Sequence, residues 1–300
     1  MKLAMITVTR NDIYRFDEWV AYYNEYKDDV FMHIIVDDAS EKSYVDKIKT
    51  TFTESIIIER AVNGGSNAAV NDGLRCALQN KEVDAIMVLD NDIQFEKGSL
   101  QNMYDYLYSD EKLGMVGPLV LKCKSDLVED FGVNLTYFSS KFLYGGCKRS
   151  EVPKSIAMYV DVVPGGITMS KRSFYEKVGF QDESIFMYCD ERDMSYRAKL
   201  SGFKEGVTSK AVCWHQHKYC PPVGRRLRSV FLTERNKVYL IKKYKGIVAA
   251  TLNAAWTALR MTAILFLHPT NSGVKLNYSQ TIKGLYNGLR GNLDNSNIWF

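Results

Sequence analysis

Asp90 and Asp92 are the residues whose spacing points most directly to chemistry. They follow the apolar run AIMVL (85–89), with one residue between them. Two carboxylates this close repel each other, so such a pair is usually either solvated or bridged by a cation. Oxygen ligands suit hard divalent ions such as Mg²⁺ and Mn²⁺. An acidic turn that caps the next segment would show the same spacing, so both interpretations stay open.

A second acidic group occupies the stretch CDERDMSYRAKLSGF, where Asp190, Glu191 and Asp193 stand at the start of a predicted helix. The helix dipole favours acidic residues in a first turn, and Asp193 could also pair with Arg197 four residues later. A general base would look the same, since it is one carboxylate whose neighbours tune its basicity.

The stretch CWHQHKYC (213–220) combines two Cys and two His in eight residues. A structural zinc site needs four converging ligands, usually in two separated pairs, and eight residues are cramped for it. A redox pair is disfavoured because the motif C-x-x-C is absent from the sequence. A single metal-ligating histidine among bystander residues remains.

The elements that must position these groups alternate regularly. Short apolar runs predict strands at 3–8, 31–36, 55–59 and 85–89, and helix-length segments at 12–26, 43–52 and 67–79 separate them. This order is typical of an α/β fold with a parallel sheet covered on both faces. Further along, the region 174–203 predicts helix ending near Gly202, 206–214 predicts a strand, and the remainder is helical.

Polar stretches follow each of the first four strands: TRN (9–11), DDAS (37–40), NGGSN (63–67) and DNDI (90–93). Ligands of open α/β sheets bind at the carboxyl ends of the strands, so these stretches predict the rim of one site. One carboxylate of Asp37 and Asp38 could accept hydrogen bonds from a ribose or a base, although Ser40 or Ser43 could equally cap the next helix. Gly64 and Gly65 permit close approach of a ligand to the backbone.

Composition indicates an ordinary globular protein of 300 residues, with 46% hydrophobic and 25% charged residues and six scattered cysteines. The cysteine pattern and the short apolar run at the N-terminus predict a reducing, cytoplasmic setting. Charge is uneven, because residues 226–300 carry 11 Lys/Arg against 2 Asp/Glu, whereas the whole chain has a net charge of +4. We therefore expect a catalytic domain at 1–225 and a basic helical region at 226–300.

In order and spacing, the motifs resemble family 2 glycosyltransferases with the GT-A fold, and within them a rhamnosyltransferase and galactofuranosyltransferase-like branch. The resemblance covers about residues 3–245 and rests on TVTRN, VDDAS, NGGSNAAVNDGL, LDNDI, PGGITMSKRSFYEKVGF with DERD, AVCWHQH, and RSVFLTERNKVYLIKKY. It implies a Rossmann-like, mostly parallel central sheet flanked by helices, with a C-terminal helical extension.

The resemblance also implies roles for individual residues. Asp92, with Asp90 and a late histidine, His215, would hold a metal, which the imidazole shifts towards Mn²⁺ over Mg²⁺. Glu191 would be the base, although the family has Asp there, so Asp190 stays an alternative. Residues expected at the UDP- or dTDP-linked donor sugar are Thr9, Arg10, Asp37, Asp38, Asn63, Gly64, Asn67, Asn71 and Asp90; those expected at the acceptor are Gly165, Gly166, Asp193 and His217, the last being also the fallback metal ligand.

The implied activity is inverting sugar transfer to a hydroxyl of a glycan or lipid-linked glycan, in bacterial surface polysaccharide synthesis. In a sugar nucleotidyltransferase, a glycine-rich loop would follow the first strand, but TVTRND has no glycine there. A zinc-dependent nucleic-acid-binding module is the non-enzymatic alternative. The basic residues are not interleaved with an RNA-binding aromatic signature, so we expect no nucleic-acid partner.

Residues 246–267 (GIVAATLNAAWTALRMTAILFL) form the longest apolar segment. A membrane-spanning helix is disfavoured because Arg260 and Asn253 lie inside it. Leu252, Trp256 and Leu259 begin an apolar stripe, and the basic tail would suit an anionic membrane surface. We therefore predict peripheral attachment at the inner face of the cell membrane, with packing on the domain or homodimerisation through these helices as the alternatives.

Overall fold

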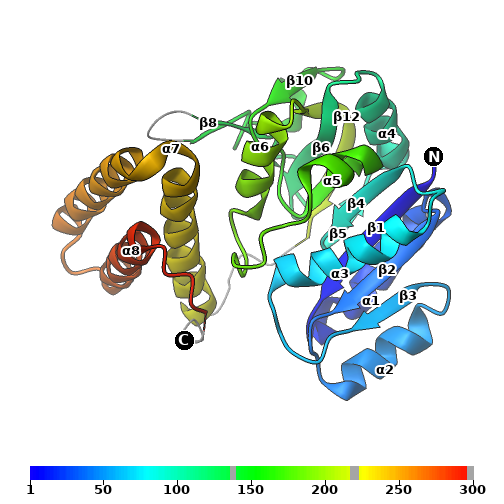
Figure 1. The fold of residues 1–300 in the computed structure, drawn as a ribbon, viewed down its shortest axis with the longest axis horizontal. Helices are drawn as coiled ribbons and strands as arrows, with labels where there is room; N and C mark the ends of the chain where they lie inside the picture. Colours follow the sequence, from blue (N-terminus) through cyan, green and yellow to red (C-terminus); the bar gives the residue numbers. More distant parts are fainter. Residues whose placement is uncertain (136–139, 217–222, 296–300) are drawn as a thin grey trace. The chain divides into compact units, whose positions relative to one another are not determined.

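The computed structural model describes residues 1–135, 140–216 and 223–295. They form an α/β sheet structure and a group of C-terminal helices (Figure 1). The strands are β1 (Leu3–Thr9), β2 (Met32–Asp37), β3 (Ile56–Glu59), β4 (Ala85–Leu89), β5 (Ile93–Phe95), β6 (Leu113–Lys122), β7 (Val128–Asp130), β8 (Val133–Leu135), β9 (Ser140–Phe142), β10 (Ala157–Val160), β11 (Ile167–Lys171) and β12 (Lys204–His215).

The α-helices are α1 (Phe16–Tyr26), α2 (Lys42–Thr51), α3 (Ser66–Gln79), α4 (Ser99–Tyr108), α5 (Arg172–Val178), α6 (Asp190–Leu200), α7 (Val223–Leu267) and α8 (Ser272–Arg290). Short 3₁₀ turns occupy Ile13–Arg15, Lys27–Asp29 and Arg149–Glu151. Gly246 has φ 84° and ψ 170°, a conformation outside the helical region, so it breaks α7 into two helical parts.

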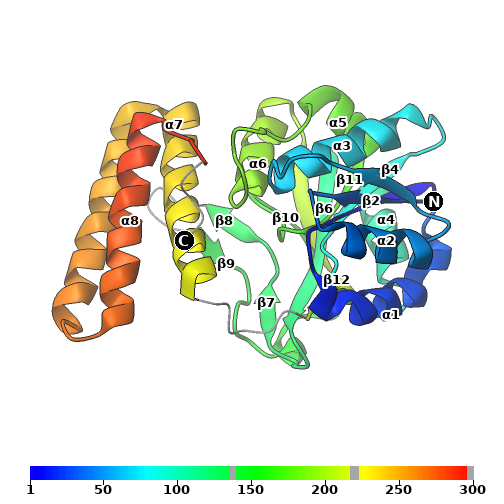
Figure 2. The ribbon, with the colours of Figure 1, turned by 90° about the horizontal axis from the view of Figure 1, so that it is seen from below.

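The main sheet has the strand order β10-β12-β6-β11-β4-β1-β2-β3, with β5 on β12 and β7 on β6. The neighbours β4, β1, β2 and β3 run parallel, as do β12 and β6, whereas β11 is antiparallel to both of its neighbours. A separate two-stranded sheet pairs β8 with β9 (Figure 2). The alternating order predicted for the first ninety residues is thus present as parallel strands joined by helices.

Side chains of successive strand residues point to opposite faces, and both faces are buried. Ala4, Ile6 and their neighbours in β2 pack against α3, α5 and the later part of α6. Leu3 and Met5 pack on the other face with α1 and α4, while α1 and α2 enclose an aromatic cluster around Phe16 and Trp19. This two-sided burial explains why the strands are continuous apolar runs in the sequence.

Some predicted boundaries were wrong. The segment 12–26 begins with the 3₁₀ turn Ile13–Arg15, and α1 starts only at Phe16. The region 174–203 holds parts of two helices, because Gly179 with φ 86° ends α5 before α6 begins at Asp190. Gly202 does take the left-handed conformation expected after the end of a helix, with φ 83°.

The chain divides into two compact units. Among the described residues, the first comprises 1–135, 140–183 and 194–216, and the second comprises 184–193 and 223–295. The boundary therefore falls inside α6, after Asp193, and places the start of that helix with the C-terminal helices.

Candidate active site

Asp90, Asp92 and His215 come together at the end of β4. Each offers one ligand atom, and these atoms lie within 4.8 Å of one another. The sheet places them, because β4 ends at Leu89 and His215 is the last residue of β12, where it pairs with Ile93 of β5. The backbone amide of Gln216 also donates to the carbonyl of Asp92 at 2.8 Å.

Glu129 of β7 stands behind the histidine. Its Oε1 lies 3.3 Å from Nδ1 of His215, while Nε2 of the same ring lies 3.4 Å from Oδ1 of Asp92. Burial lowers the pKa of His215, but hydrogen bonds to Asp92 and Glu129 outweigh it and raise that pKa to about 10. A carboxylate that holds the far nitrogen of a ligating histidine is a common support of metal sites.

Arg15 extends the cluster on its other side, where it forms an ion pair with Oδ2 of Asp92. Its guanidinium also binds Asp12, with NH2 2.7 Å from Oδ2. Burial opposes the charge on Arg15, yet Asp12 and Asp92 together raise its pKa. Asn91 donates to Asp12 at 3.0 Å, so the 3₁₀ turn before α1 is tied to the acidic stretch after β4.

Gly166 adjoins Asp90. Its carbonyl accepts a hydrogen bond from the backbone amide of Asp90 at 2.8 Å. It has φ +68°, and a Cβ atom there would overlap the carboxylate of Asp90. Only glycine fits both the backbone conformation and this close approach. Gly165, which precedes it, is exposed.

The donor atoms fit a divalent metal ion. Two carboxylates and one imidazole, the last oriented by Glu129, are a ligand set that Mn²⁺ accepts readily. Asp92 is buried and His215 is half-buried, whereas Asp90 is exposed. The group of three is therefore open to solvent at Asp90.

Asp37 is the last residue of β2, which runs parallel to β1, and it pairs in register with Thr9 of β1. Its side chain is 1% exposed, and Oδ2 accepts a hydrogen bond from the amide of Ser40 at 2.9 Å. Its Oδ1 is buried and has no hydrogen-bond partner among the described residues. A buried carboxylate oxygen without a hydrogen bond costs free energy of folding. Asp37 is therefore suited to accept a hydrogen bond from a ligand. The hydroxyl of Thr9 lies 2.6 Å from that of Tyr44.

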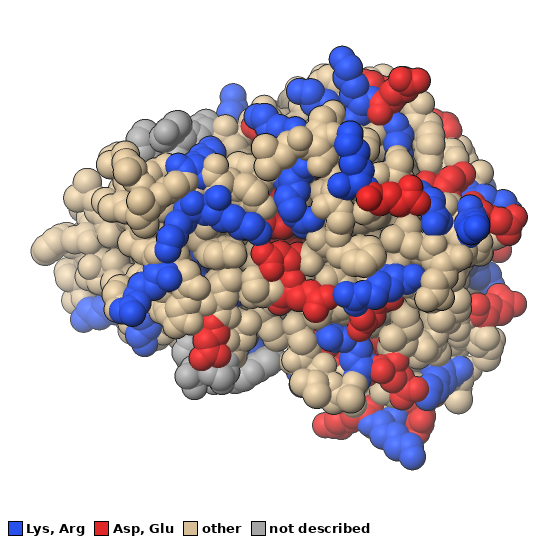
Figure 3. All heavy atoms as spheres, in the orientation of Figure 1, with Lys and Arg blue, Asp and Glu red and all other residues tan. Residues whose placement is uncertain are grey.

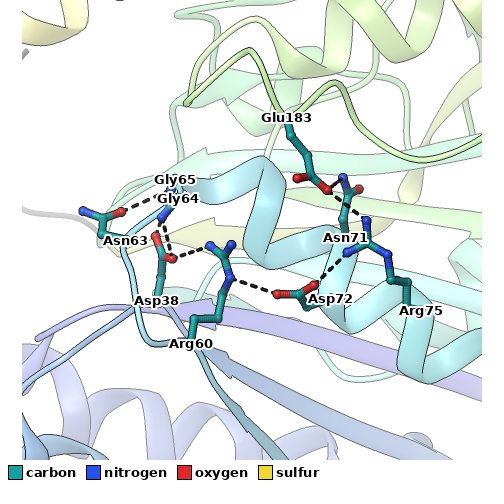
Figure 4. Close-up of polar contacts among 9 residues, drawn as sticks. All are labelled: Asp38, Arg60, Asn63, Gly64, Gly65, Asn71, Asp72, Arg75 and Glu183. Atoms are coloured by element: carbon teal, nitrogen blue, oxygen red, sulfur yellow. Dashed lines mark hydrogen bonds and ion pairs between the residues drawn. The ribbon is translucent and has the colours of Figure 1, made fainter. Parts of the chain in front are cut away.

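Asp38 holds the loop after β3 (Figure 4). Oδ1 accepts from NH1 of Arg60 at 2.5 Å and from the amide of Gly64 at 3.0 Å, and Oδ2 accepts from the amide of Gly65 at 3.0 Å. Oδ1 of Asn63 also accepts from the amide of Gly65, at 3.1 Å. These contacts use the carboxylate of Asp38 to shape the loop, and its expected contact with the donor sugar nucleotide stays a prediction.

Asn67 and Asn71 of α3 are buried and bind the chain after α5. The amide nitrogen of Asn67 donates to the carbonyl of Asp182 at 3.1 Å. Asn71 donates to the side chain of Glu183 at 2.8 Å (Figure 4). It also donates to the carbonyl of Gln181 at 3.0 Å and accepts from the amide of Gln181 at 2.9 Å. Both side chains thus anchor residues 181–183, and their expected contact with the donor stays a prediction.

The remaining expected residues are distributed as follows. Arg10 is exposed directly after β1. Asp190 and Glu191 are half-buried in the first turn of α6, within the second unit. Asp193 is buried there, and its Oδ1 accepts from Nζ of Lys243 at 2.9 Å and from the hydroxyl of Tyr244 at 2.7 Å. His217 lies outside the described residues.

A family comparison decides the identity. Residues 17–178, more than half of the chain, match the family model for glycosyl transferase family 2. The chain belongs to this family. It is therefore a glycosyltransferase, and the match contains the two aspartates of the candidate metal site.

This family 2 glycosyltransferase is 25% identical over 213 residues to the low-salt glycan biosynthesis hexosyltransferase Agl10 of Haloferax volcanii, covering 68% of each chain. Its fold is similar to that of the mannosyltransferase PcManGT from Pyrobaculum calidifontis in complex with GDP-Man and Mn²⁺, with TM-score 0.56 and 14% identity over 98% of this chain and 88% of that one. It is also similar to GalNAc-T7 with UDP, GalNAc and Mn²⁺, with TM-score 0.55 and 16% identity over 77% of this chain.

The chain spans 47% of the length of the GalNAc-T7 structure. The likenesses confirm the predicted fold class, namely a mostly parallel α/β sheet of the GT-A type with flanking helices and a C-terminal helical extension.

Sequence reasoning missed Glu129 and Arg15 of this family 2 glycosyltransferase. Glu129 lies on the three-residue strand β7, in a region without clear periodicity. Arg15 lies in the turn that had been assigned to a regular helix. The only sequence signal for either residue is its charge, which many surface residues share.

Proposed function

We propose that this glycosyltransferase carries out inverting, metal-dependent transfer of a sugar from a UDP- or dTDP-linked donor to a hydroxyl of a glycan or lipid-linked glycan. The observation that carries the proposal is the cluster of Asp90, Asp92 and His215, with Glu129 supporting the histidine. The Mn²⁺ named in the two solved structures of similar fold supports the choice of metal.

The site residues of the first unit would each have a defined role. Asp90, Asp92 and His215 would hold Mn²⁺, which when bound supplies positive charge against the leaving diphosphate. The unpaired Oδ1 of Asp37 would accept a hydrogen bond from the base or ribose of the donor. Gly166 keeps room for the carboxylate of Asp90.

Glu191 would remove the proton of the acceptor hydroxyl, whose oxygen then attacks the anomeric carbon opposite the leaving group. A positioned general base is typically worth about 10²–10⁴-fold in rate. Support for Glu191 comes from its place in the acidic first turn of α6. Asp190 precedes it directly and is the alternative base.

The identity of the donor is tested with a panel of UDP-, dTDP- and GDP-sugars. Thermal shift and donor hydrolysis are measured for each sugar with and without Mn²⁺. We expect Mn²⁺-dependent stabilisation by at least one UDP- or dTDP-sugar, with rhamnose and galactofuranose as the first candidates. Failure of every nucleotide sugar to bind would overturn the proposal, and a response limited to GDP-sugars would replace the proposed nucleotide.

The assignment of the general base is tested with the variants Glu191→Gln and Asp190→Asn. Glu191→Gln should lower kcat by about 10²–10⁴-fold while donor binding stays unchanged, and Asp190→Asn should keep most of the turnover. The reversed pattern assigns the base to Asp190. The configuration of the product at the anomeric carbon, read by NMR, distinguishes inversion from retention.

For the acceptor and the place of action, we propose a growing surface polysaccharide and peripheral attachment to the inner face of the cell membrane. Among the described residues, one helical segment, Arg226–Leu267, is long and apolar enough to cross a membrane by length and composition. The second part of α7, residues 247–267, carries the apolar stripe. Its members Leu252, Trp256 and Leu259 are 52%, 51% and 63% exposed.

The buried side of this helix carries Asn253 and Thr257 beside Ala250 and Ala254, while the larger apolar side chains of the stripe face outward. Gln280 and Thr281 of α8, which packs along α7 (Figure 2), are buried as well. In Figure 3 the surface over this part of α7 is mostly uncharged, and Lys245, Arg260 and Lys275 are exposed on the two helices. An apolar face bordered by cations suits an anionic lipid surface.

Co-sedimentation with phosphatidylglycerol-containing vesicles tests this attachment. We expect binding by the full chain that weakens at about 0.5 M salt and is lost when Leu252 and Trp256 are both changed to Glu. Leu200→Glu, an equivalent change at a residue that is 79% exposed, is the matched control. Absence of vesicle binding, or a dimer in sedimentation equilibrium that the same double variant abolishes, would contradict the membrane proposal.

A further inference from the structure

The turn that leads into α6 has an uncommon backbone conformation. Tyr188 and Cys189, directly before Asp190, have φ values of 67° and 64°. Residues with side chains rarely occupy this left-handed region, and they do so where the surrounding structure holds them. Two such residues in succession, directly before Asp190 and the candidate base Glu191, need a specific support.

Asn236 of α7 provides that support. Its side-chain amide donates to the carbonyls of Met187 and Tyr188, both at 2.9 Å. Its Oδ1 accepts from Nε of Arg235 at 3.0 Å, and Asn236 itself is fully buried. Both amide hydrogens and the oxygen are therefore used, which fixes the orientation of the side chain.

The same face of α7 contacts the segment on both sides of the acidic turn. Leu240, one helical turn after Asn236, packs against Ile185 and Cys189. One turn further, Lys243 and Tyr244 bind the carboxylate of Asp193. Contacts at intervals of three to four residues thus hold the backbone before and after Asp190 and Glu191.

We propose that Asn236 is a positioning residue for the catalytic base. By holding the left-handed turn at Tyr188 and Cys189, it sets the direction in which Glu191 leaves the start of α6. This inference rests on the proposed role of Glu191 and requires no contact between Asn236 and substrate.

Asn236→Asp is the direct test, because it keeps the shape of the side chain and places an acceptor oxygen against two carbonyl oxygens. Asn253→Asp is the matched control, since Asn253 is also a buried asparagine of α7, beyond the break at Gly246. Asn236→Ser, which keeps one donor, replaces Asn236→Asp if that variant does not fold, and should show an intermediate effect.

Hydrogen exchange by mass spectrometry and turnover with the donor selected by the panel provide the readouts. For Asn236→Asp we expect faster exchange confined to peptides covering 185–193 and a fall in kcat of about 10–100-fold. Affinity for Mn²⁺ with UDP and the donor KM should stay within about threefold. Unchanged exchange and kcat, or an equal loss in Asn253→Asp, would overturn the positioning role.

A double variant separates this inference from the assignment of the base. In a Glu191→Gln background, the effect of Asn236→Asp on kcat should shrink to less than about threefold, because both changes act on one step. If Glu191→Gln impairs turnover and the two effects multiply, Asn236 acts elsewhere and the positioning role fails. If Glu191→Gln turns over like the wild type, the base assignment itself fails.

Discussion

Glu129 and His215 form a pair in which the carboxylate orients the ring: Oε1 lies 3.3 Å from Nδ1, which leaves Nε2 on the side of Asp92. The two residues come from neighbouring parts of the sheet, since both β7 and β12 pair with β6. The sheet therefore positions both the candidate metal ligand His215 and its support Glu129.

Glu129→Gln should lower the affinity for Mn²⁺ by about 10–100-fold, because an amide orients the imidazole less strongly than a carboxylate does. Titration calorimetry with Mn²⁺ in the presence of UDP measures this change. Asp130→Asn is the control on the same strand, because Asp130 accepts from the amide of Gly132 at 2.8 Å. Equal Mn²⁺ affinity in the Glu129 variant and the wild type would refute a supporting role.

Gly166→Ala should reduce both stability and Mn²⁺ affinity. The left-handed backbone costs a residue with a Cβ about 1–2 kcal/mol, and this Cβ also displaces the carboxylate of Asp90. We expect at least about a tenfold loss of kcat, since small displacements at a site are costly. Gly146→Ala shares the backbone strain, with φ +81°, but its Cβ meets nothing within 4 Å. It should lose stability in urea titrations without losing Mn²⁺ affinity.

Asp38→Asn should destabilise the fold by about 1.5–3 kcal/mol, because it weakens hydrogen bonds from Arg60, Gly64 and Gly65 to a buried charged group. Asp72→Asn removes another carboxylate that binds Arg60, but Asp72 is more exposed, so its loss should cost less than about 1 kcal/mol. Urea denaturation compares the two. A raised donor KM with unchanged stability in Asp38→Asn would instead show that Asp38 contacts the donor.

Acid should destabilise the protein through His33, which is 5% exposed in β2 and stacks on Tyr23. Burial lowers its pKa from 6.5 to about 3. Below pH 6.5 the unfolded chain therefore binds a proton that the folded chain does not, and stability falls as the pH falls. The loss between pH 6.5 and 5 is roughly 1.5 kcal/mol. His33→Gln should flatten this dependence in urea titrations at pH 5 and 7, and an unchanged slope would rule out His33 as its source.

The sequence predicted what depends on period and chain order. Apolar runs identified the first four strands, and Asp37, Asp90 and Asp92 lie at or just after the carboxyl ends of two of them, as expected. Contacts between distant loops carry no such pattern. Nothing in the residue spacing shows that the carboxylate of Asp38 accepts hydrogen bonds from the loop after β3, or that Asn71 binds Gln181. Glu129 was missed because its strand, β7, has three residues and is too short to display a hydrophobic period.

The contacts of Arg235 have a consequence for the order in which parts of the enzyme fold during synthesis. Arg235, which adjoins Asn236, donates to the carbonyl of Asp294 and to Oδ1 of Asn295, at 3.1 and 3.0 Å. A chain emerging from the ribosome folds from its N-terminal part, so the sheet can form while residue 294 is still to be made. Arg235 gains these two partners only afterwards, whereas the partners of Asn236 all precede it or adjoin it in the chain. The contacts that join Arg235 to residues 294 and 295 are thus made after the residues of the sheet and of α7 have been synthesised.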